Sequence, residues 1–283
     1  MDKFSIDPDA KIGQVHLNVS DINQSLQFYE SFLGFKIVKK TPQTVFLASD
    51  DKFPYLIALS KARSNNSSKR AGLYHFAILL PQRKNLADFL SHLLEHENEI
   101  KIDGFADHLV SEAIYIRDPD NIGIEIYRDR LPSEWKRNNN QVIMAVEPLD
   151  MKGLLAESSS WTGFPAETTI GHVHLHVSNL AKAKKFYSEI LGFTNTASMQ
   201  GALFFAAGKY HHHIATNVWL GEHISKASRN FVGLDYFTIK FSSKDKINDA
   251  IKQLESHKIT ARELEDGSFS IFDDEQISIS LTV

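Results

Sequence analysis

An internal repeat constrains this chain more than any other feature. Ile170–Phe193 (IGHVHLHVSNLAKAKKFYSEILGF) matches Ile12–Phe35 (IGQVHLNVSDINQSLQFYESFLGF) without a gap, sharing the IG, V-H-L, V-S, F-Y and L-G-F residues. Two shorter matches follow in the same order: Gly233–Lys240 with Gly72–Leu79, and Phe272–Leu281 with Arg117–Ile126. A duplication is the simplest explanation, because self-similar segments mark repeated structural units. The two halves of the chain should therefore fold alike.

Each half reads as two modules of the order βαβββ. In the first module, Ile12–Ser20 alternates polar and apolar residues as a strand, and a helix with apolar residues at helical spacing follows and ends at Gly34. Short strand-like runs complete that module. The second begins at Leu73–Leu80, continues with a helix at Leu86–His96 and ends in a hairpin. The sequence predicts an α+β fold of four modules, with an N-terminal domain at 1–128, a connector at 129–168 and a C-terminal domain at 169–283.

Composition excludes two classes of partner. The chain has 283 residues and a net charge of −4 with mixed signs, so no basic stripe for nucleic acid is present. No apolar run approaches the roughly 20 residues needed to span a membrane. With no cysteine and no apolar leader at its start, the chain is expected to be cytoplasmic. Its 13 histidines point to metal or proton chemistry.

The hairpin within Ala106–Tyr127 carries polar groups on an otherwise apolar frame. Ile122, Ile124 and Ile126 alternate with Gly123, Glu125 and Tyr127, which places the carboxylate opposite the isoleucines. Tyr115 lies between two isoleucines on the preceding strand, and a D-P-D-N turn joins the strands. A carboxylate and a phenol can thus share one face. A solvated sheet face is the alternative for an isolated glutamate.

Comparing each repeat with its partner shows where metal-binding side chains are kept or lost. The matched positions are His75 with Tyr236, Glu125 with Ser280, and His172 with Gln14. Two histidines and one carboxylate form the set that binds non-haem Fe(II) and leaves open positions for substrate and dioxygen. Random histidines would seldom fall on matched strand faces, so these observations favour a metal site over a polar surface.

The third ligand depends on which modules share a cup. If modules one and two pair, the set is Gln14 or His16 with His75 and Glu125. If modules two and three pair, His172 joins them instead. We favour the second pairing, because His172, where the matched position has Gln14, completes the full triad with a histidine.

Three successive histidines begin the predicted strand Tyr210–Trp219. Alternation turns His212 to one face and His211 and His213 to the other, and at least one is expected to accept a proton or hold substrate. A solvated sheet edge is the alternative. His108, in the segment ADHLVSEA, is a weaker candidate.

The elements IGHVHLHVS, LYHFAIL, HHHIAT and AIYIRDPDNIGIEIY resemble the vicinal-oxygen-chelate superfamily, and within it the extradiol ring-cleaving dioxygenases of the catechol 2,3-dioxygenase type. The resemblance covers nearly the whole chain and implies modules paired into two cup-shaped half-barrels. It implies metal ligands at His75, Glu125 and His172, and catalytic roles for His212, Tyr115 and His108. The family usually builds its metal site from the last two modules, whereas Tyr236 and Ser280 remove that possibility here.

The resemblance also implies a reaction. A catechol- or hydroquinone-type substrate and O2 would meet at Fe(II), with Mn(II) as the other candidate metal, in a protein expected to be a homo-oligomer. A glyoxalase-like isomerase or lyase is one alternative, although that class generally needs a further carboxylate and Tyr55–Ser60 offers none. A non-catalytic drug-binding protein of the same fold is the other, but it leaves the histidine run and Tyr115 unexplained.

Overall fold

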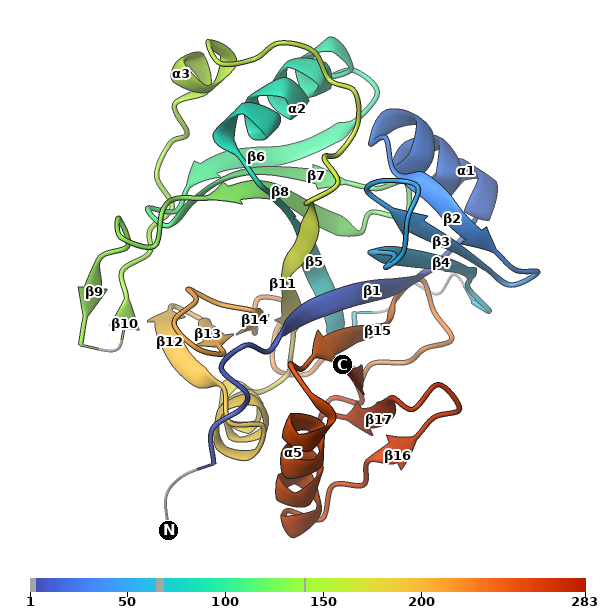
Figure 1. Ribbon diagram of the computed structural model, residues 1–283, viewed down its shortest axis with the longest axis vertical. Coiled ribbons are helices and arrows are strands. Elements are labelled where there is room, and N and C mark those ends of the chain that lie inside the picture. Colours follow the sequence, from blue (N-terminus) through green and yellow to red (C-terminus); the bar gives the residue numbers. More distant parts are fainter. Residues whose placement is uncertain (1–3, 65–68, 140) are drawn as a thin grey trace.

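Two eight-stranded sheets form the body of the molecule (Figure 1), a computed structural model that describes residues 4–64, 69–139 and 141–283. The first sheet has the order β16-β17-β18-β15-β1-β4-β3-β2. Its strands are β1 (Lys11–Val19), β2 (Lys36–Lys40), β3 (Thr44–Ala48), β4 (Ile57–Lys61), β15 (Gly233–Lys240), β16 (Arg262–Glu263), β17 (Phe269–Phe272) and β18 (Ser278–Thr282).

The second sheet has the order β12-β13-β14-β11-β5-β8-β7-β6. Its strands are β5 (Gly72–Leu80), β6 (Lys101–Asp107), β7 (Ser111–Arg117), β8 (Gly123–Asp129), β11 (Thr169–His176), β12 (Thr194–Met199), β13 (Ala202–Ala206) and β14 (Ile214–Asn217). The α+β fold of βαβββ modules predicted from the sequence is thus confirmed.

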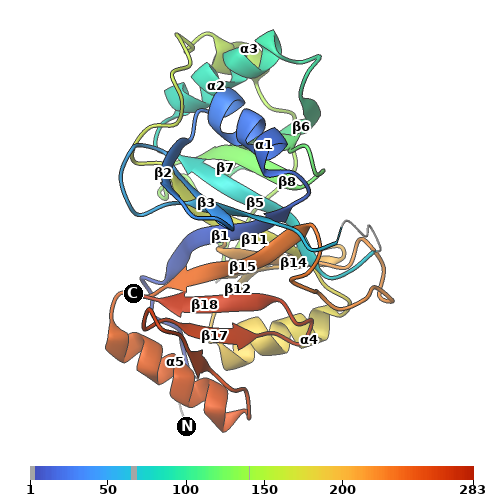
Figure 2. The ribbon, with the colours of Figure 1, turned by 90° about the vertical axis from the view of Figure 1, so that its right-hand side faces the viewer.

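The sheets join modules from opposite halves of the chain. β1 of module one pairs with β15 of module four, and β5 of module two pairs with β11 of module three, both antiparallel. Figure 2 shows β1 and β15 side by side, with β18 and β17 continuing that sheet toward α5 (Lys244–Ser256). Of the two pairings left open by the sequence, the structure has the one that brings modules two and three together.

Helices cover the outer faces of the sheets. α2 (Arg83–Glu95) packs Leu86, Phe89 and Leu93, all fully buried, into the core that the isoleucines of β7 and β8 share. The matching helices of modules one and three each turn from α to π geometry. They are α1 (Ile22–Leu26) with η1 (Gln27–Phe32), and α4 (Leu180–Lys184) with η2 (Lys185–Ile190). Among the helices of the described residues, none is long and apolar enough to cross a membrane.

The repeated F-Y pair ties consecutive modules together. The hydroxyl of Tyr29, on η1, donates to Asp118 at 3.0 Å, and the hydroxyl of Tyr187, on η2, donates to Asp273 at 2.9 Å. Both aspartates lie in the turn before the last strand of the next module, and both tyrosines are fully buried. The duplication therefore preserved a polar contact between modules as well as an apolar pattern.

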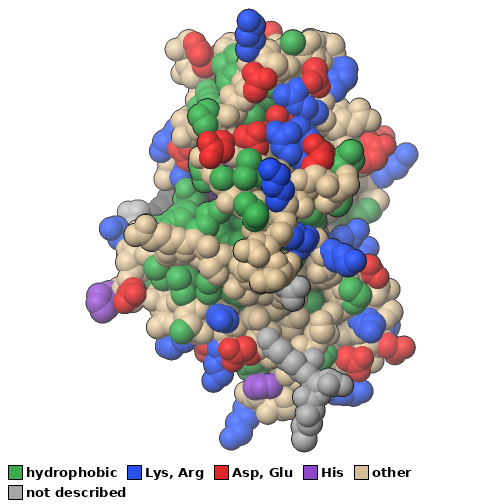
Figure 3. Space-filling model, turned by 90° about the vertical axis from the view of Figure 1, so that its left-hand side faces the viewer, with side chains coloured by type: hydrophobic (Ala, Val, Ile, Leu, Met, Phe, Trp, Pro, Cys, Tyr) green, Lys and Arg blue, Asp and Glu red, His purple; other side chains and the backbone are tan. Residues whose placement is uncertain are grey.

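The segment that we expected to connect the halves contains a two-stranded hairpin and a helix. β9 (Arg137–Asn138) pairs with β10 (Gln141–Val142), and α3 (Met151–Leu155) begins after Asp150, whose carboxylate accepts from the Gly153 amide. Leu131, Ile143 and Val146 of this segment are exposed. Figure 3 shows hydrophobic side chains gathered across the middle of the face on the left of Figure 1.

Candidate functional site

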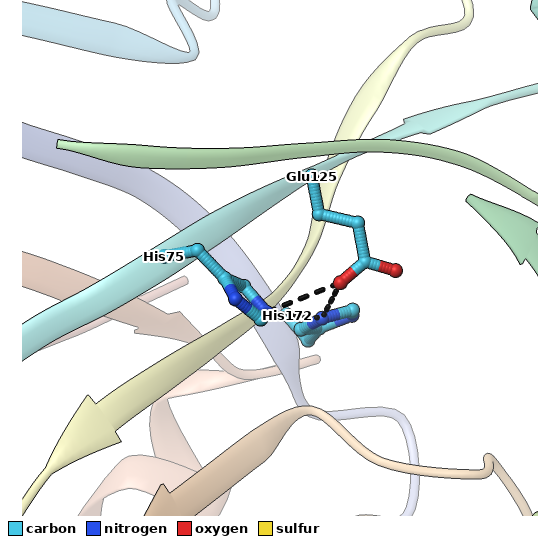
Figure 4. Close-up of side chains that lie close together, drawn as sticks. All are labelled: His75, Glu125 and His172. Atoms are coloured by element: carbon cyan, nitrogen blue, oxygen red, sulfur yellow. Dashed lines mark hydrogen bonds and ion pairs between the residues drawn. The ribbon is translucent and has the colours of Figure 1, made fainter. Parts of the chain in front are cut away.

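Two histidines and one glutamate converge inside the sheet of modules two and three. Glu125 Oε2 lies 3.1 Å from His75 Nε2 and 3.0 Å from His172 Nε2, and the two nitrogens are 3.3 Å apart. All three side chains point toward one another from β8, β5 and β11 (Figure 4) and are at most 7% exposed. The structure therefore brings together the three residues that the sequence singled out as metal ligands.

The strand register explains why these residues meet. Ala77 of β5 pairs with His172 on one side and with Glu125 on the other, so these three residues lie abreast on adjacent strands. His75 is two residues away on β5, hence on the same face. The small side chain of Ala77 leaves the space between them for the imidazole and the carboxylate.

A glycine makes room for His75. Gly123 pairs with His75 across β5 and β8, and a Cβ there would overlap the Tyr74 carbonyl oxygen and lie 3.0 Å from the His75 Cβ. Close backbone approach of this kind requires glycine.

Electrostatics favours an ionised Glu125. Burial opposes ionisation of Glu125, but the adjacent His172 and His75 outweigh it and hold the pKa of the carboxyl well below its ordinary value. Burial lowers the pKa of His75, against the raising effect of Glu125. A carboxylate and imidazole lone pairs are the form in which these side chains bind a divalent cation.

The separations fit a metal ion. Ligand atoms at right angles around an ion, each at a bond length of about 2.1 Å, lie about 3 Å apart. The three observed separations are 3.0, 3.1 and 3.3 Å. His75, Glu125 and His172 also form one of the groups of the described residues able to hold an ion. The donor set and its spacing agree with the facial two-histidine, one-carboxylate arrangement.

Tyr115 and His108 form a hydrogen-bonded pair beside the triad. Tyr115 of β7 lies opposite Glu125 of β8, and its hydroxyl is 2.7 Å from His108 Nε2. His108 Nδ1 is 2.8 Å from the Ala145 carbonyl, so this nitrogen carries the proton and, in a neutral ring, Nε2 accepts from the phenol. Burial and the nearby Glu125 raise the pKa of Tyr115 well above its ordinary value, so the phenol is protonated.

His212 lies on the other side of the triad. Its ring centroid is 4.2 Å from that of His172, and burial lowers its pKa well below the ordinary value. The predicted strand Tyr210–Trp219 is wrong at both ends, because β14 comprises only Ile214–Asn217. The histidines form a buried loop in which His211 and His212 bond through their rings, so the solvated edge is also excluded.

These groups line one cavity of about 360 Å³. Its walls are largely apolar and aromatic, with Phe204, Trp219, Met144 and Val146 among them. Two charged residues also border it, Asp103 and Arg117, and they are paired with each other. An engineered apolar cavity of about 150 Å³ holds benzene, so the volume here accommodates an aromatic ring with space beside it.

The equivalent positions in the other sheet hold no such triad. Gln14 accepts a hydrogen bond from the Thr238 hydroxyl at 2.8 Å, and the His16 ring stacks on Tyr236 at 3.9 Å. His16 Nε2 is 2.8 Å from the Tyr55 hydroxyl. Gln14 and His16, the alternative third ligands, therefore form hydrogen bonds with neighbours and lie in a different sheet from His75 and Glu125.

Sequence reasoning missed a second layer of polar residues. Asp129 contacts His211, and the two come from segments about eighty residues apart that neither the repeat nor any motif connects. The one available signal was the charged end, Arg128 and Asp129, of the strand that also carries Glu125.

Two histidines and a glutamate able to hold a metal, inside a sheet of paired βαβββ modules, define a class of protein, and the chain belongs to it: residues 11–126 and 169–270 match the Glyoxalase/Bleomycin resistance protein/Dioxygenase superfamily. The resemblance seen in the sequence is thus confirmed. Among individual proteins, one from Bacillus subtilis (strain 168) named catechol-2,3-dioxygenase is 40% identical over 276 residues, covering 95% of each chain.

Solved structures agree with the fold. A putative dioxygenase from Bacillus subtilis has a TM-score of 0.68 at 12% identity, over 98% of this chain and 86% of that one. Glyoxalase I from Zea mays has a TM-score of 0.56 at 13% identity, over 96% of this chain and 92% of that one. Because both identities are low, these likenesses concern the fold alone.

Proposed function

We propose that the protein is an Fe(II)-dependent extradiol dioxygenase that opens the ring of a catechol- or hydroquinone-type substrate with O2. The observation that carries this proposal is the triad of His75, Glu125 and His172 at the wall of a largely apolar cavity, with protonatable groups on both sides. The 40% identity to a protein named catechol-2,3-dioxygenase supports the same enzyme class.

His75, Glu125 and His172 would hold the metal, which supplies Lewis acidity toward the two substrate oxygens and a redox path to O2. With three positions taken by protein, others stay open for substrate. Mn(II) satisfies the same donor set and remains the second candidate.

The remaining polar groups would handle protons. His212 has a lowered pKa and is neutral near pH 7, so it can accept a proton from a substrate hydroxyl. Tyr115 keeps its proton, because burial raises its pKa, and can donate a hydrogen bond to a substrate oxygen. His108, bonded to Tyr115 at 2.7 Å, orients that phenol and can exchange its proton.

The apolar walls would bind the ring and exclude water. Phe204, Met144 and Val146 offer dispersion contacts to an aromatic face. Keeping bulk water away strengthens the polar contacts inside and protects reactive species from side reactions.

A glyoxalase-like reaction fits the structure less well. That class generally needs a further carboxylate, and the acidic residues that line the described cavity are Glu125, already in the triad, and Asp103, already paired with Arg117. A non-catalytic binding protein would not require Tyr115 and His212 beside a metal set.

The test is anaerobic loading with Fe(II), followed by oxygen uptake with catechol, alkylcatechols and hydroquinone. We expect one O2 consumed per ring opened, with both oxygen atoms in a coloured, conjugated product. Stoichiometric metal binding with no oxygen uptake from any of these substrates would refute the dioxygenase and favour the isomerase.

A further inference from the structure

A chain of three side chains runs from the cavity into the protein behind His212. His212 Nδ1 lies 2.8 Å from His211 Nδ1, and His211 Nε2 lies 2.8 Å from Asp129 Oδ1. His212 lines the cavity, whereas His211 is fully buried and Asp129 is the last residue of β8. The order is therefore cavity, His212, His211, Asp129.

The hydrogen bonds among these three side chains determine the tautomer of His212. An ionised aspartate only accepts hydrogen bonds, so His211 Nε2 must donate to it. In a neutral His211 the other nitrogen, Nδ1, then accepts, and His212 Nδ1 must donate to it. His212 is left with a proton on Nδ1 and a lone pair on Nε2, which is the nitrogen available to the cavity.

Asp129 is itself held in place. Its second oxygen accepts from the Tyr210 hydroxyl at 2.8 Å, and Tyr210 in turn lies 2.8 Å from the Tyr127 hydroxyl. A side chain at Gly171, next to His172, would overlap that Tyr127 hydroxyl. Gly171, beside the candidate metal ligand His172, thus leaves room for the Tyr127 hydroxyl, the first group of this hydrogen-bond network.

A residue of the connector covers this hydrogen-bond network on its solvent side. The Trp135 ring lies 5.2 Å from the His211 ring, and its Nε1 donates to the carbonyls of Val110 and Arg130. Trp135 is 8% exposed, so it helps to shield His211 from solvent. Hydrogen bonds in such a low-dielectric site are stronger than in water.

We propose that Asp129 and His211 are positioning residues that fix the Nδ1–H tautomer and the ring orientation of His212, so that its Nε2 can take a proton from a bound catechol. In that step the substrate O–H bond breaks, the proton moves to His212 Nε2, and the electron pair stays on the substrate oxygen. The imidazolium keeps its Nδ1–H bond to His211, which strengthens as the ring gains charge. This inference rests on the proposed function for the substrate, but the tautomer can be measured without it.

The first test is structural and needs no metal. In the full-length protein labelled with ¹⁵N-histidine, nitrogen chemical shifts identify which ring nitrogen carries the proton. We expect the Nδ1–H tautomer at His212 in the wild type, and a mixture of tautomers in Asp129→Leu, which removes the acceptor without adding a donor. An Nε2–H tautomer at His212, or an imidazolium at His211, in the wild type would overturn the proposal.

The second test is kinetic. Asp129→Leu and His211→Phe, which keeps a ring against Tyr210 and Trp135, should each lower kcat by about 10–100-fold, part of what a general base contributes. KM and iron content should stay near wild-type values, and the double variant should lose no more than the worse single one. Asp235→Leu removes an ion-paired carboxylate of the other sheet and serves as the matched control.

The outcomes separate this inference from the proposed function. Unchanged kcat in both single variants, or a loss confined to KM or iron content, would overturn the positioning role. If the wild type opens no catechol ring, the proposed function fails while the tautomer measurement still decides the inference. A variant that does not fold leaves the other variant and the wild-type tautomer to decide it.

Discussion

The repeat supplies its own control for the metal site, since His172 and Gln14 occupy matched positions in the two sheets. We predict that His172→Ala loses metal-dependent stabilisation whereas Gln14→Ala keeps it. His172 Nε2 lies 3.0 Å from Glu125 Oε2 and 3.3 Å from His75 Nε2, while Gln14 bonds to Thr238 in the other sheet.

The expected change in Tm follows from the linkage between metal binding and folding. A metal present at 100 times its Kd stabilises the folded state by about 2.7 kcal/mol. For a chain of this size, each kcal/mol raises Tm by about 2–4 °C, so wild type and Gln14→Ala should gain about 5–11 °C. Removing the hydrogen-bond partner of a metal ligand usually weakens metal binding by at most about 100-fold. Removing the ligand itself should weaken metal binding by at least that factor. At the same metal concentration the stabilisation of His172→Ala then falls to about 0.4 kcal/mol, or about 1 °C.

The assay is thermal unfolding of each variant with and without Mn(II), repeated with Fe(II) under anaerobic conditions. Comparing each variant with its own metal-free form cancels any direct effect of the substitution on folding. A full Tm gain in His172→Ala, or loss of the gain in Gln14→Ala, would refute the assignment of the third ligand to module three.

Four further predictions concern the same molecule. Glu125→Gln and His75→Ala should each abolish stoichiometric metal binding with the fold retained, as metal analysis and circular dichroism would show. His212→Ala should keep iron and catechol binding but lose about 10²–10⁴-fold in turnover; wild-type turnover would remove it from the mechanism. Tyr115→Phe should show a milder loss in single-turnover kinetics, because only a hydrogen-bond donor is removed. Burial lowers the pKa of His16 to about 4, so only the unfolded chain binds this proton between pH 6.5 and 4. The contribution of His16 to the free energy of unfolding should fall by about 3 kcal/mol as pH drops through that window. In urea titrations, the free energy of unfolding plotted against pH should therefore be less steep for His16→Phe than for the wild type.

The repeat and the alternating strands were enough to predict most of the fold. Period-2 patterns located β1, β5, β8 and β11, and the loss of ligand-type residues at Tyr236 and Ser280 indicated which modules carry the site. Such patterns succeed because each strand has one face in a core, which fixes both its existence and its orientation.

The details that the sequence could not give depend on contacts between distant segments. The strand predicted for Tyr210–Trp219 begins only at Ile214, because His211 bonds to Asp129 and the chain before β14 follows these side-chain contacts into the interior. Alternation within one segment contains no information about an acceptor on another strand. For the same reason, the tautomer chain behind His212 could be found only in three dimensions.

The exchange of modules between the halves has a consequence for how such a molecule could originate. Neither half alone completes a sheet: β1 and β5 of the first half find their antiparallel partners, β15 and β11, in the second. A half-length ancestor would expose two open strand edges, which favour association with an identical copy. The present chain then corresponds to a two-fold symmetric dimer fused into one polypeptide. In a fused chain only one of the two matched sites needs ligand residues, and the other sheet has Gln14, Tyr236 and Ser280 at those positions.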